Sequence, residues 1–241
     1  MPAAALVTGA GRRIGRVLAL DLARSGHDLA LHCRSSLPAT LALAAEIRAL
    51  GRRTAVLAAD LAEEEETRGI VAAAVQALGP LSLLVNNASI FVNEPQTREA
   101  ERALWDRQLA INLRAPVVLS REFAAQLPEQ ARGLVVNILD SRLARPTANY
   151  LSYTVSKAGL AAATRVLARA LAPRIRVNAI APGPVLPAPG MREEAFTRLV
   201  EATPLRRRPE PWEIGAALRF FLEAPSVTGQ TILVDGGQHM G

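Results

Sequence analysis

TGAGRRIG, residues 8–15, is the segment that decides the fold. It begins at the end of the apolar run ALVT and leads into a segment, reaching Ser25, whose apolar residues recur at helical spacing. Gly9, Gly11 and Gly15 let the backbone turn tightly and approach a pyrophosphate, which then contacts the amides at the helix start. The segment therefore predicts a dinucleotide-binding turn in the first βα unit of a doubly wound sheet.

Strand-like and helix-like segments alternate along the rest of the chain. Short apolar or β-branched runs predict strands at ALVT, DLALHC, TAVLAA, LSLLVNN, LVVNIL, RVNAIA and TILVD. Longer amphipathic segments predict helices up to Ser25 and at 38–50, 63–78, 98–127 and 151–171, with two more before the last strand. This alternation predicts an α/β protein: a single doubly wound, Rossmann-like domain with a mostly parallel sheet flanked by helices.

The ends of these segments support the same architecture. Gly26, Gly51 and Gly79 each follow a periodic segment, where a left-handed cap is expected. The acidic run AEEEE, residues 62–66, lies at a predicted helix start, where carboxylates favour the positive end of the dipole.

A proline-rich segment, APGPVLPAPG at residues 181–190, breaks the alternation of strands and helices. We therefore predict a substrate loop at about 182–200 within one domain of residues 1–241.

Composition excludes several classes of function. The 241 residues carry a formal charge of +6, but the arginines are spread along the chain and aromatic residues are only 4%, which disfavours nucleic-acid binding. One cysteine, Cys33, and three scattered histidines exclude a disulfide framework and predict no metal site. No apolar stretch reaches about 18 residues and no signal peptide is recognised, so we expect a soluble, cytoplasmic protein without a membrane partner.

The segment LHCRSS, residues 31–36, predicts which dinucleotide is bound. An NAD site usually has an acidic residue at the end of the second strand, whereas a 2′-phosphate is better met by a cation and small donors. Arg34, Ser35 and Ser36 occupy this place, so NADPH is favoured over NADH. Asp60, which closes the third strand, has two open interpretations: an acceptor for the adenine amine, or a helix cap.

Lys157 is the only lysine among the 28 lysine and arginine residues of the chain. It follows Tyr153 by four positions on a predicted helix, so the two side chains share one face. An ammonium is more compact than a guanidinium, and its charge would stabilise a phenolate and lower the pKa of the tyrosine. The pair is a candidate acid or base, although by itself it could also be an unrelated pair on a solvated helix.

Six motifs, in order and at similar spacing, resemble the short-chain dehydrogenase/reductase family over essentially the whole chain. They are TGAGRRIG, NNAS at 86–89, Asn112 in INLRAP, Tyr153-x-x-x-Lys157, RVNAIAPG at 176–183 and TGQTILVDGG at 228–237. The resemblance implies that Asn112 holds a water in a proton relay, that Lys157 also binds the nicotinamide ribose, and that Pro182 and Gly183 border the nicotinamide. The predicted cofactor-binding residues are Gly9, Arg12, Arg13, Ile14, Gly15, Arg34, Ser35, Ser36, Asp60, Leu61, Asn87, Ala88, Ser89, Tyr153, Lys157, Pro182 and Gly183.

Two residues depart from the usual pattern of that family. Arg13 stands where most members have the second glycine of the motif, and Asp140 stands where most have a serine, thirteen residues before Tyr153. A carboxylate would repel a carbonyl oxygen, but it can accept a tyrosine hydroxyl or N–H groups, which argues against a simple ketone substrate. Both residues resemble the pteridine reductase branch and the bacterial dihydromonapterin reductases, and the match does not choose between these two groups.

NNASIF, residues 86–91, adds to this resemblance. It implies that Phe91 stacks on a pterin ring and that Ser89 hydrogen-bonds it, whereas Ile90 stands where protozoan-type reductases have a polar residue. Tyr150 corresponds to a second active-site tyrosine in some members. From the residues alone, Phe91 could equally be a core aromatic and Tyr150 a partly exposed residue at a helix start.

These observations predict an NADPH-dependent reductase of a pterin C=N bond in a dihydropterin or dihydrofolate. Asp140 and Tyr153 would deliver the proton, Lys157 and Asn112 would complete the catalytic set, and Arg13 would face the cofactor phosphates. The predicted substrate-binding residues are Arg13, Ser89, Phe91, Asp140, Tyr150 and Tyr153. Two alternatives are a carbonyl reductase of the same family, for example of a 3-oxoacyl thioester, and a non-catalytic NADPH-binding protein. The resemblance also implies a homotetramer.

Overall fold

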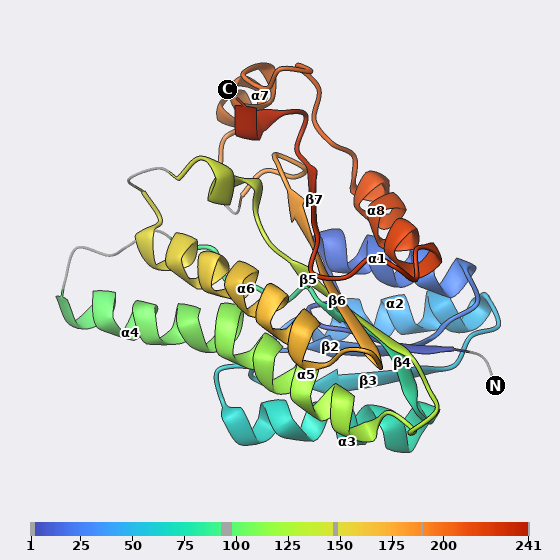
Figure 1. Ribbon diagram of the computed structural model, residues 1–241. Helices are drawn as coiled ribbons and strands as arrows, with labels where there is room; N and C mark the ends of the chain where they lie inside the picture. Colours follow the sequence, from blue (N-terminus) through green and yellow to red (C-terminus); the bar gives the residue numbers. More distant parts are fainter. Residues whose placement is uncertain (1–2, 93–97, 147–148, 189, 241) are drawn as a thin grey trace.

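Seven strands form one parallel sheet in the part of the chain that this computed structural model describes, residues 3–92, 98–146, 149–188 and 190–240 (Figure 1). Their order is β3-β2-β1-β4-β5-β6-β7, and every neighbouring pair is parallel. The strands are β1 (Ala4–Val7), β2 (Asp28–Cys33), β3 (Thr54–Ala58), β4 (Leu81–Asn86), β5 (Gly133–Ile138), β6 (Ile175–Pro182) and β7 (Thr231–Val234). The order reverses between β1 and β4, the switch point at which doubly wound sheets bind ligands, so the predicted fold is confirmed.

Two hydrophobic layers, one on each face of the sheet, hold the fold together. Alternate residues of a strand point to opposite faces, so Ala5 and Val7 pack into one layer and Ala4 and Leu6 into the other. The first layer contains α1 (Arg13–Arg24), α2 (Leu37–Ala49) and α8 (Pro211–Glu223), and the second contains α3 (Glu64–Leu78), α5 (Ala115–Gln126) and α6 (Leu151–Ala170). Figure 1 shows these two groups of helices on opposite sides of the sheet.

Several local predictions are confirmed to within one or two residues. The run DLALHC is β2, and the acids of AEEEE provide the first turn of α3. Gly26, Gly51 and Gly79 end their helices with φ of 95°, 76° and 87°, a region that side chains with a Cβ rarely adopt.

The predicted helix over 98–127 is not continuous. It consists of α4 (Arg98–Leu109), a π-helical turn η1 (Ala110–Arg114) and α5. The physical reason is Pro116, which has no N–H to donate to the carbonyl of Asn112, so the regular α-helical hydrogen bond is missing at that point. The wider turn lies at a residue predicted to be catalytic, Asn112.

The predicted substrate loop is shorter than the range 182–200. Pro182 is the last residue of β6, and α7 (Glu193–Glu201) occupies the second half of the range, because its acids lie in the first turn and its apolar Phe196 is buried. Position 189 lies outside the described residues. Among the helices that the structure describes, none is long and apolar enough to cross a bilayer.

Candidate active site

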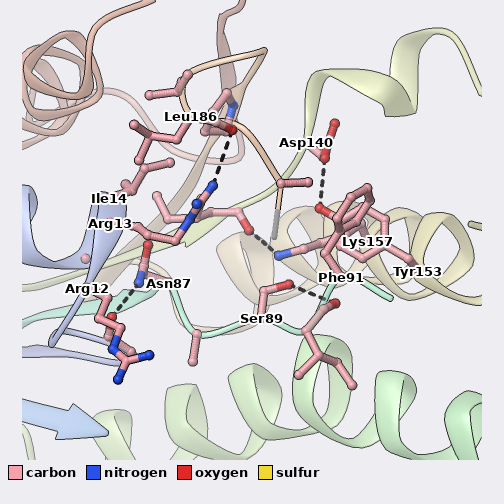
Figure 2. Close-up of a pocket in the computed structure, with 18 of the residues that line it drawn as sticks. Arg12, Arg13, Ile14, Asn87, Ser89, Phe91, Asp140, Tyr153, Lys157 and Leu186 are labelled. Carbon is pink, nitrogen blue, oxygen red and sulfur yellow. Dashed lines mark hydrogen bonds between the residues drawn. The ribbon is translucent and has the colours of Figure 1, made fainter. Parts of the chain in front are cut away.

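A cavity of about 470 Å³ opens at the carboxyl ends of the central strands, next to the switch point. Every residue predicted to bind the cofactor lines it. Of the predicted substrate-binding residues, Tyr150 does not line it. Figure 2 shows Arg12, Arg13 and Ile14 on one side of this cavity, and Asp140, Tyr153, Lys157 and Phe91 gathered on the other.

The glycine-rich turn is fitted closely against the segment that follows β4. The side-chain amide of Asn87 donates hydrogen bonds to the carbonyls of Thr8 (2.9 Å) and Gly9 (3.2 Å). A Cβ added at Gly15 would lie 2.6 Å from Nδ2 of Asn87, and would also strike the Gly9 carbonyl. Only glycine therefore fits position 15, and the turn keeps the cradle shape that a pyrophosphate requires.

Arg13 lines the cavity, as predicted, and also makes a contact that was not predicted. Its φ is 54°, in the left-handed region that glycine adopts with less strain than arginine. Its guanidinium donates hydrogen bonds to the carbonyls of Pro187 (2.9 Å) and Leu186 (3.3 Å), as Figure 2 shows for Leu186. Arg13 thus ties the glycine-rich turn to the loop after β6, and its role at the cofactor phosphates stays a prediction.

The end of β2 carries the predicted phosphate-binding group. Arg34, Ser35 and Ser36 line the cavity together, with the Arg34 side chain half exposed. Asp60 lies beside them, but its carboxylate accepts the Ala62 amide (3.0 Å) and the Arg107 guanidinium (2.7 Å). Asp60 therefore has structural partners, but it is not the cap of α3, since Glu63 occupies that position.

The electrostatics of Asp60 follow from these contacts. Its slight burial acts to raise its pKa, but the Ala62 amide and Arg107 together outweigh that effect and hold the pKa below its usual value. Asp60 therefore carries its negative charge at neutral pH, 3.5 Å from Arg34. Such a charge holds the Arg34 guanidinium at the edge of the cavity.

Asp140 and Tyr153 form a hydrogen-bonded pair. The Tyr153 hydroxyl donates to Oδ2 of Asp140 at 2.8 Å, and Oδ1 of the same carboxylate accepts the backbone amide of Arg142, also at 2.8 Å (Figure 2). Burial and, after it, the negative charge of Asp140 raise the pKa of Tyr153 well above its usual range. The tyrosine is therefore a protonated phenol, which is the opposite of the lowered pKa expected from the lysine alone.

Lys157 lies one helical turn after Tyr153 on α6, and it is 2% exposed. Its ammonium donates a hydrogen bond of 2.7 Å to the carbonyl of Ile138 and lies 6.0 Å from the centroid of the Tyr153 ring. Burial lowers its pKa to about 8. The Lys157 side chain extends between packed elements, so that its ammonium reaches the end of β5. A long, unbranched cationic side chain fits this position.

Asn112 lies behind residues that line the cavity, and its predicted water-binding role stays a prediction. Its Oδ1 accepts the Ile90 amide (2.9 Å) and the Ser89 hydroxyl (3.1 Å), while its Nδ2 donates to the Ile90 carbonyl (3.0 Å) and to Oγ of Ser156 (3.1 Å). These bonds fasten the segment before Phe91 to α6. In this structure Asn112 therefore positions its neighbours. Because the Ser89 hydroxyl donates its proton to Asn112, its oxygen can still accept a hydrogen bond from a ligand in the cavity.

Three aromatic rings pack together next to the cavity, and two of them, Phe91 and Tyr153, line it. Phe91 stacks on Tyr150 with centroids 4.3 Å apart and planes inclined by 15°, and it meets Tyr153 edge-on at 4.7 Å. Phe91 lines the cavity and is only partly buried, so it is not an ordinary core aromatic. Tyr150 backs it from behind, in a left-handed conformation with φ of 60° at the start of α6.

Sequence reasoning missed several residues of the site. His32 accepts the Gly9 amide on Nδ1 (3.3 Å), and burial lowers the pKa of its ring, so the neutral ring holds the glycine-rich turn. Arg142 lies beside Phe91 and Tyr150. Gln238 also lines the cavity and was not predicted, whereas Leu186, Met191, Phe196 and Leu199 lie in the predicted substrate loop but were not named individually. The nearness of Arg142 to Asp140 in sequence was a signal that could have identified it.

Comparisons with known proteins agree with this geometry. A family model described as enoyl-(acyl carrier protein) reductase matches residues 9–239. The alternative dihydrofolate reductase 1 (FolM) of Brucella canis, solved in complex with NADP, is 48% identical, with a TM-score of 0.94 and coverage of 99% of this chain and 94% of that chain. A blue fluorescent protein from a metagenomic library, solved with NADPH, is 34% identical, with a TM-score of 0.89 and coverage of 98% and 97%. The 3-oxoacyl-(acyl-carrier-protein) reductase FabG of Staphylococcus epidermidis is 32% identical over 245 residues, which span 100% of both chains.

Proposed function

This chain belongs to the short-chain dehydrogenase/reductase family, and we propose that it is an NADPH-dependent reductase that transfers a hydride to a C=N bond of a dihydropterin or dihydrofolate. The coarser part of this statement, an NADP-dependent short-chain oxidoreductase, follows from the family match and from the NADP and NADPH held by the two solved relatives. The finer part, the pterin substrate, rests on the side chains at the substrate end of the cavity.

The residues of the cavity fit NADPH. Gly9 and Gly15 let the turn close tightly against Asn87 and Ala88, where an added Cβ would clash, and Arg34 with Ser35 and Ser36 supplies the cation and hydroxyls that a 2′-phosphate needs. NADPH supplies the hydride of the reaction. Lys157 would hold the ribose next to the nicotinamide. Gly183 lines the cavity there and packs against Asp235, where an added Cβ would lie 2.6 Å from Cα of Asp235.

The hydrogen bond between Tyr153 and Asp140 is the observation that carries the pterin proposal. A ketone oxygen placed at the tyrosine hydroxyl would lie beside a carboxylate, and two acceptors there would repel each other. A pterin instead presents amino and ring N–H groups to that carboxylate. The pair holds one proton on the phenol oxygen of Tyr153, where the ring nitrogen next to the reduced carbon would receive it.

The packed aromatic rings support the same substrate. Phe91, backed by Tyr150, offers a flat surface at the cavity, and a planar nitrogen-rich ring would stack on it. Stacking would fix the height of the ring above the nicotinamide, while Asp140 would fix its rotation. These two restraints are what hydride transfer requires of the protein.

A second candidate function is the reduction of a 3-oxoacyl thioester. The observation in its favour is the 32% identity with FabG over the whole length of both chains. The presence of Asp140 in place of a neutral hydroxyl donor argues against it, because a thioester ketone carries no N–H group for the carboxylate.

The experiment that separates the two candidates follows NADPH oxidation by the purified protein. 7,8-Dihydromonapterin, dihydrobiopterin and dihydrofolate are assayed in parallel with an acetoacetyl thioester at matched concentrations. We expect turnover with the dihydropterins only. Turnover with the thioester alone would make the chain a carbonyl reductase, and NADPH binding without turnover on either class would favour a non-catalytic protein.

A further inference from the structure

Arg142 is a cation of the cavity whose charge the proposed chemistry does not use. It lies in the 3₁₀ turn η2 (Ser141–Ala144), two residues after Asp140, and its side chain is half-buried. Its backbone amide binds Asp140, but within the described ranges its guanidinium forms no ion pair. A half-buried charge next to apolar surface is costly unless it meets an opposite charge.

The aromatic neighbours provide only part of that compensation. The guanidinium carbon of Arg142 makes cation–π contacts, lying 5.0 Å from the centroid of Phe91 and 5.2 Å from that of Tyr150, whose rings stack 4.3 Å apart. An aromatic ring carries no formal charge, so these contacts leave the guanidinium able to pair with a carboxylate.

Three of the other cations around the cavity have identified contacts. Arg13 donates to the carbonyls of the loop after β6, Lys157 to the carbonyl of Ile138, and Arg34 pairs with Asp60. Arg12 lies at the start of α1, beside the glycine-rich turn that faces the cofactor. Arg142 differs from all of these because it lies at the substrate end, against Phe91 and next to the Asp140–Tyr153 pair.

We propose that the Arg142 guanidinium binds a carboxylate on the part of the substrate that extends beyond the pterin ring, so that the enzyme prefers dihydropterins with an anionic side chain to neutral ones. Dihydrofolate has this chemistry, since its aminobenzoyl group ends in a glutamate. Its pterin would stack on Phe91, and its side chain would leave the cavity past the edge of the Phe91–Tyr150 pair. The planar fork of arginine suits a carboxylate, with two parallel hydrogen bonds.

This inference rests on the proposed function, and its test compares two substrates that share the reducible ring. KM and kcat are measured for dihydrofolate, which is anionic, and for dihydrobiopterin, whose side chain is neutral. For Arg142→Gln we expect KM for dihydrofolate to rise about 10-fold or more, because a charge-assisted hydrogen bond is lost, with KM for dihydrobiopterin within about 2-fold. Arg142→Lys should restore part of the dihydrofolate affinity. Added salt should weaken only dihydrofolate binding to the wild-type enzyme.

Arg145→Gln is the matched control, since Arg145 is an exposed arginine just after the same turn and does not line the cavity. It should leave KM for both substrates unchanged, and NADPH binding reports that each variant is folded. An equal change in KM for the two substrates, or no change, would overturn the role of Arg142 while the proposed function stands. Reduction of the thioester with neither dihydropterin reduced would overturn both.

Discussion

The hydroxyl of Tyr153 donates its hydrogen bond to the carboxylate of Asp140, 2.8 Å away, in a buried position. Desolvation and the negative charge act in the same direction on this phenol, since both disfavour the phenolate. The pair therefore stores a proton at the substrate end of the cavity. A tyrosine whose pKa is lowered by a lysine would instead lose its proton more readily. The roles of Asp140, Lys157 and Arg13 can each be tested separately.

Replacing Asp140 should damage catalysis more than cofactor binding. Asp140→Ser and Asp140→Asn remove the carboxylate that orients the ring and the phenol, so we expect kcat for dihydropterins to fall about 100-fold or more. The dissociation constant of NADPH, measured by fluorescence titration, should change less than about 3-fold, since the aspartate lies at the substrate end. A rise in dihydropterin turnover in Asp140→Ser would contradict the role assigned to Asp140.

Asp140 should also control the ionisation of Tyr153. The chain has two tyrosines, so in a Tyr150→Phe background tyrosinate absorbance reports Tyr153 alone. Because Asp140 raises the pKa of Tyr153, that absorbance should appear at lower pH in Asp140→Asn, Tyr150→Phe than in Tyr150→Phe. The measurement is an ultraviolet pH titration of the folded protein up to about pH 11, just above the usual tyrosine pKa. Identical titrations would mean that the carboxylate does not act on the phenol.

Local sequence patterns were sufficient for the fold and for the list of cavity residues. The run DLALHC predicted β2 without error, because a strand buried on both faces is a continuous apolar run. Gly15 and Arg34 line the cavity as expected, because the switch point of a doubly wound sheet places these turns together. These predictions depend on chain order and residue type, and both are present in the sequence.

The directions of side chains were not predictable in the same way. The Arg13 guanidinium donates to loop carbonyls at Leu186 and Pro187, a contact that local patterns did not predict because the loop is far away in sequence. The π-helical turn at Asn112 depends on Pro116 and on bonds to another segment, which helical periodicity does not encode. The raised pKa of Tyr153 needed the depth of burial, which is a property of the assembled tertiary structure.

Lys157→Arg tests why a chain so rich in arginine keeps one lysine. The ammonium lies in a fully packed position, with its hydrogen bond to Ile138, and a wider guanidinium would displace the end of β5 or the phenol next to it. We expect kcat with NADPH and a dihydropterin to fall about 100-fold or more. Near-normal turnover in this variant would show that only the positive charge is needed.

The buried ammonium of Lys157 should also make stability depend on pH. Its pKa is about 8 in the folded protein and near 10.5 when unfolded, so the unfolded chain binds more protons between these values. Burial of the charged ammonium destabilises the folded protein fully below pH 8. This destabilisation disappears as the pH rises towards 10.5, because the folded protein can release the proton from Lys157. The stability difference is the free energy of unfolding of Lys157→Met minus that of wild type. This difference should therefore be about 2 kcal/mol larger at pH 7 than at pH 10.

Urea unfolding at pH 7 and pH 10 measures this difference. Arg165→Met is the matched control, because Arg165 is an exposed residue on the same helix, and its substitution should give the same change at both pH values. If the stability difference between Lys157→Met and wild type is independent of pH, the lysine is not held as a desolvated cation.

Arg13 combines a strained backbone with a tether, and two substitutions separate these properties. Both Arg13→Gly and Arg13→Ala remove the hydrogen bonds to Leu186 and Pro187, so both should raise KM for the dihydropterin to a similar extent. The left-handed φ of 54° strains the backbone of any residue that has a Cβ. The glycine variant should therefore be more stable than the alanine variant by about 1 kcal/mol in urea unfolding. Equal stabilities of the two variants would mean that the backbone relaxes at position 13. Unequal KM values would mean that the cavity depends on the conformation of the turn and not on the hydrogen bonds from Arg13 to Leu186 and Pro187.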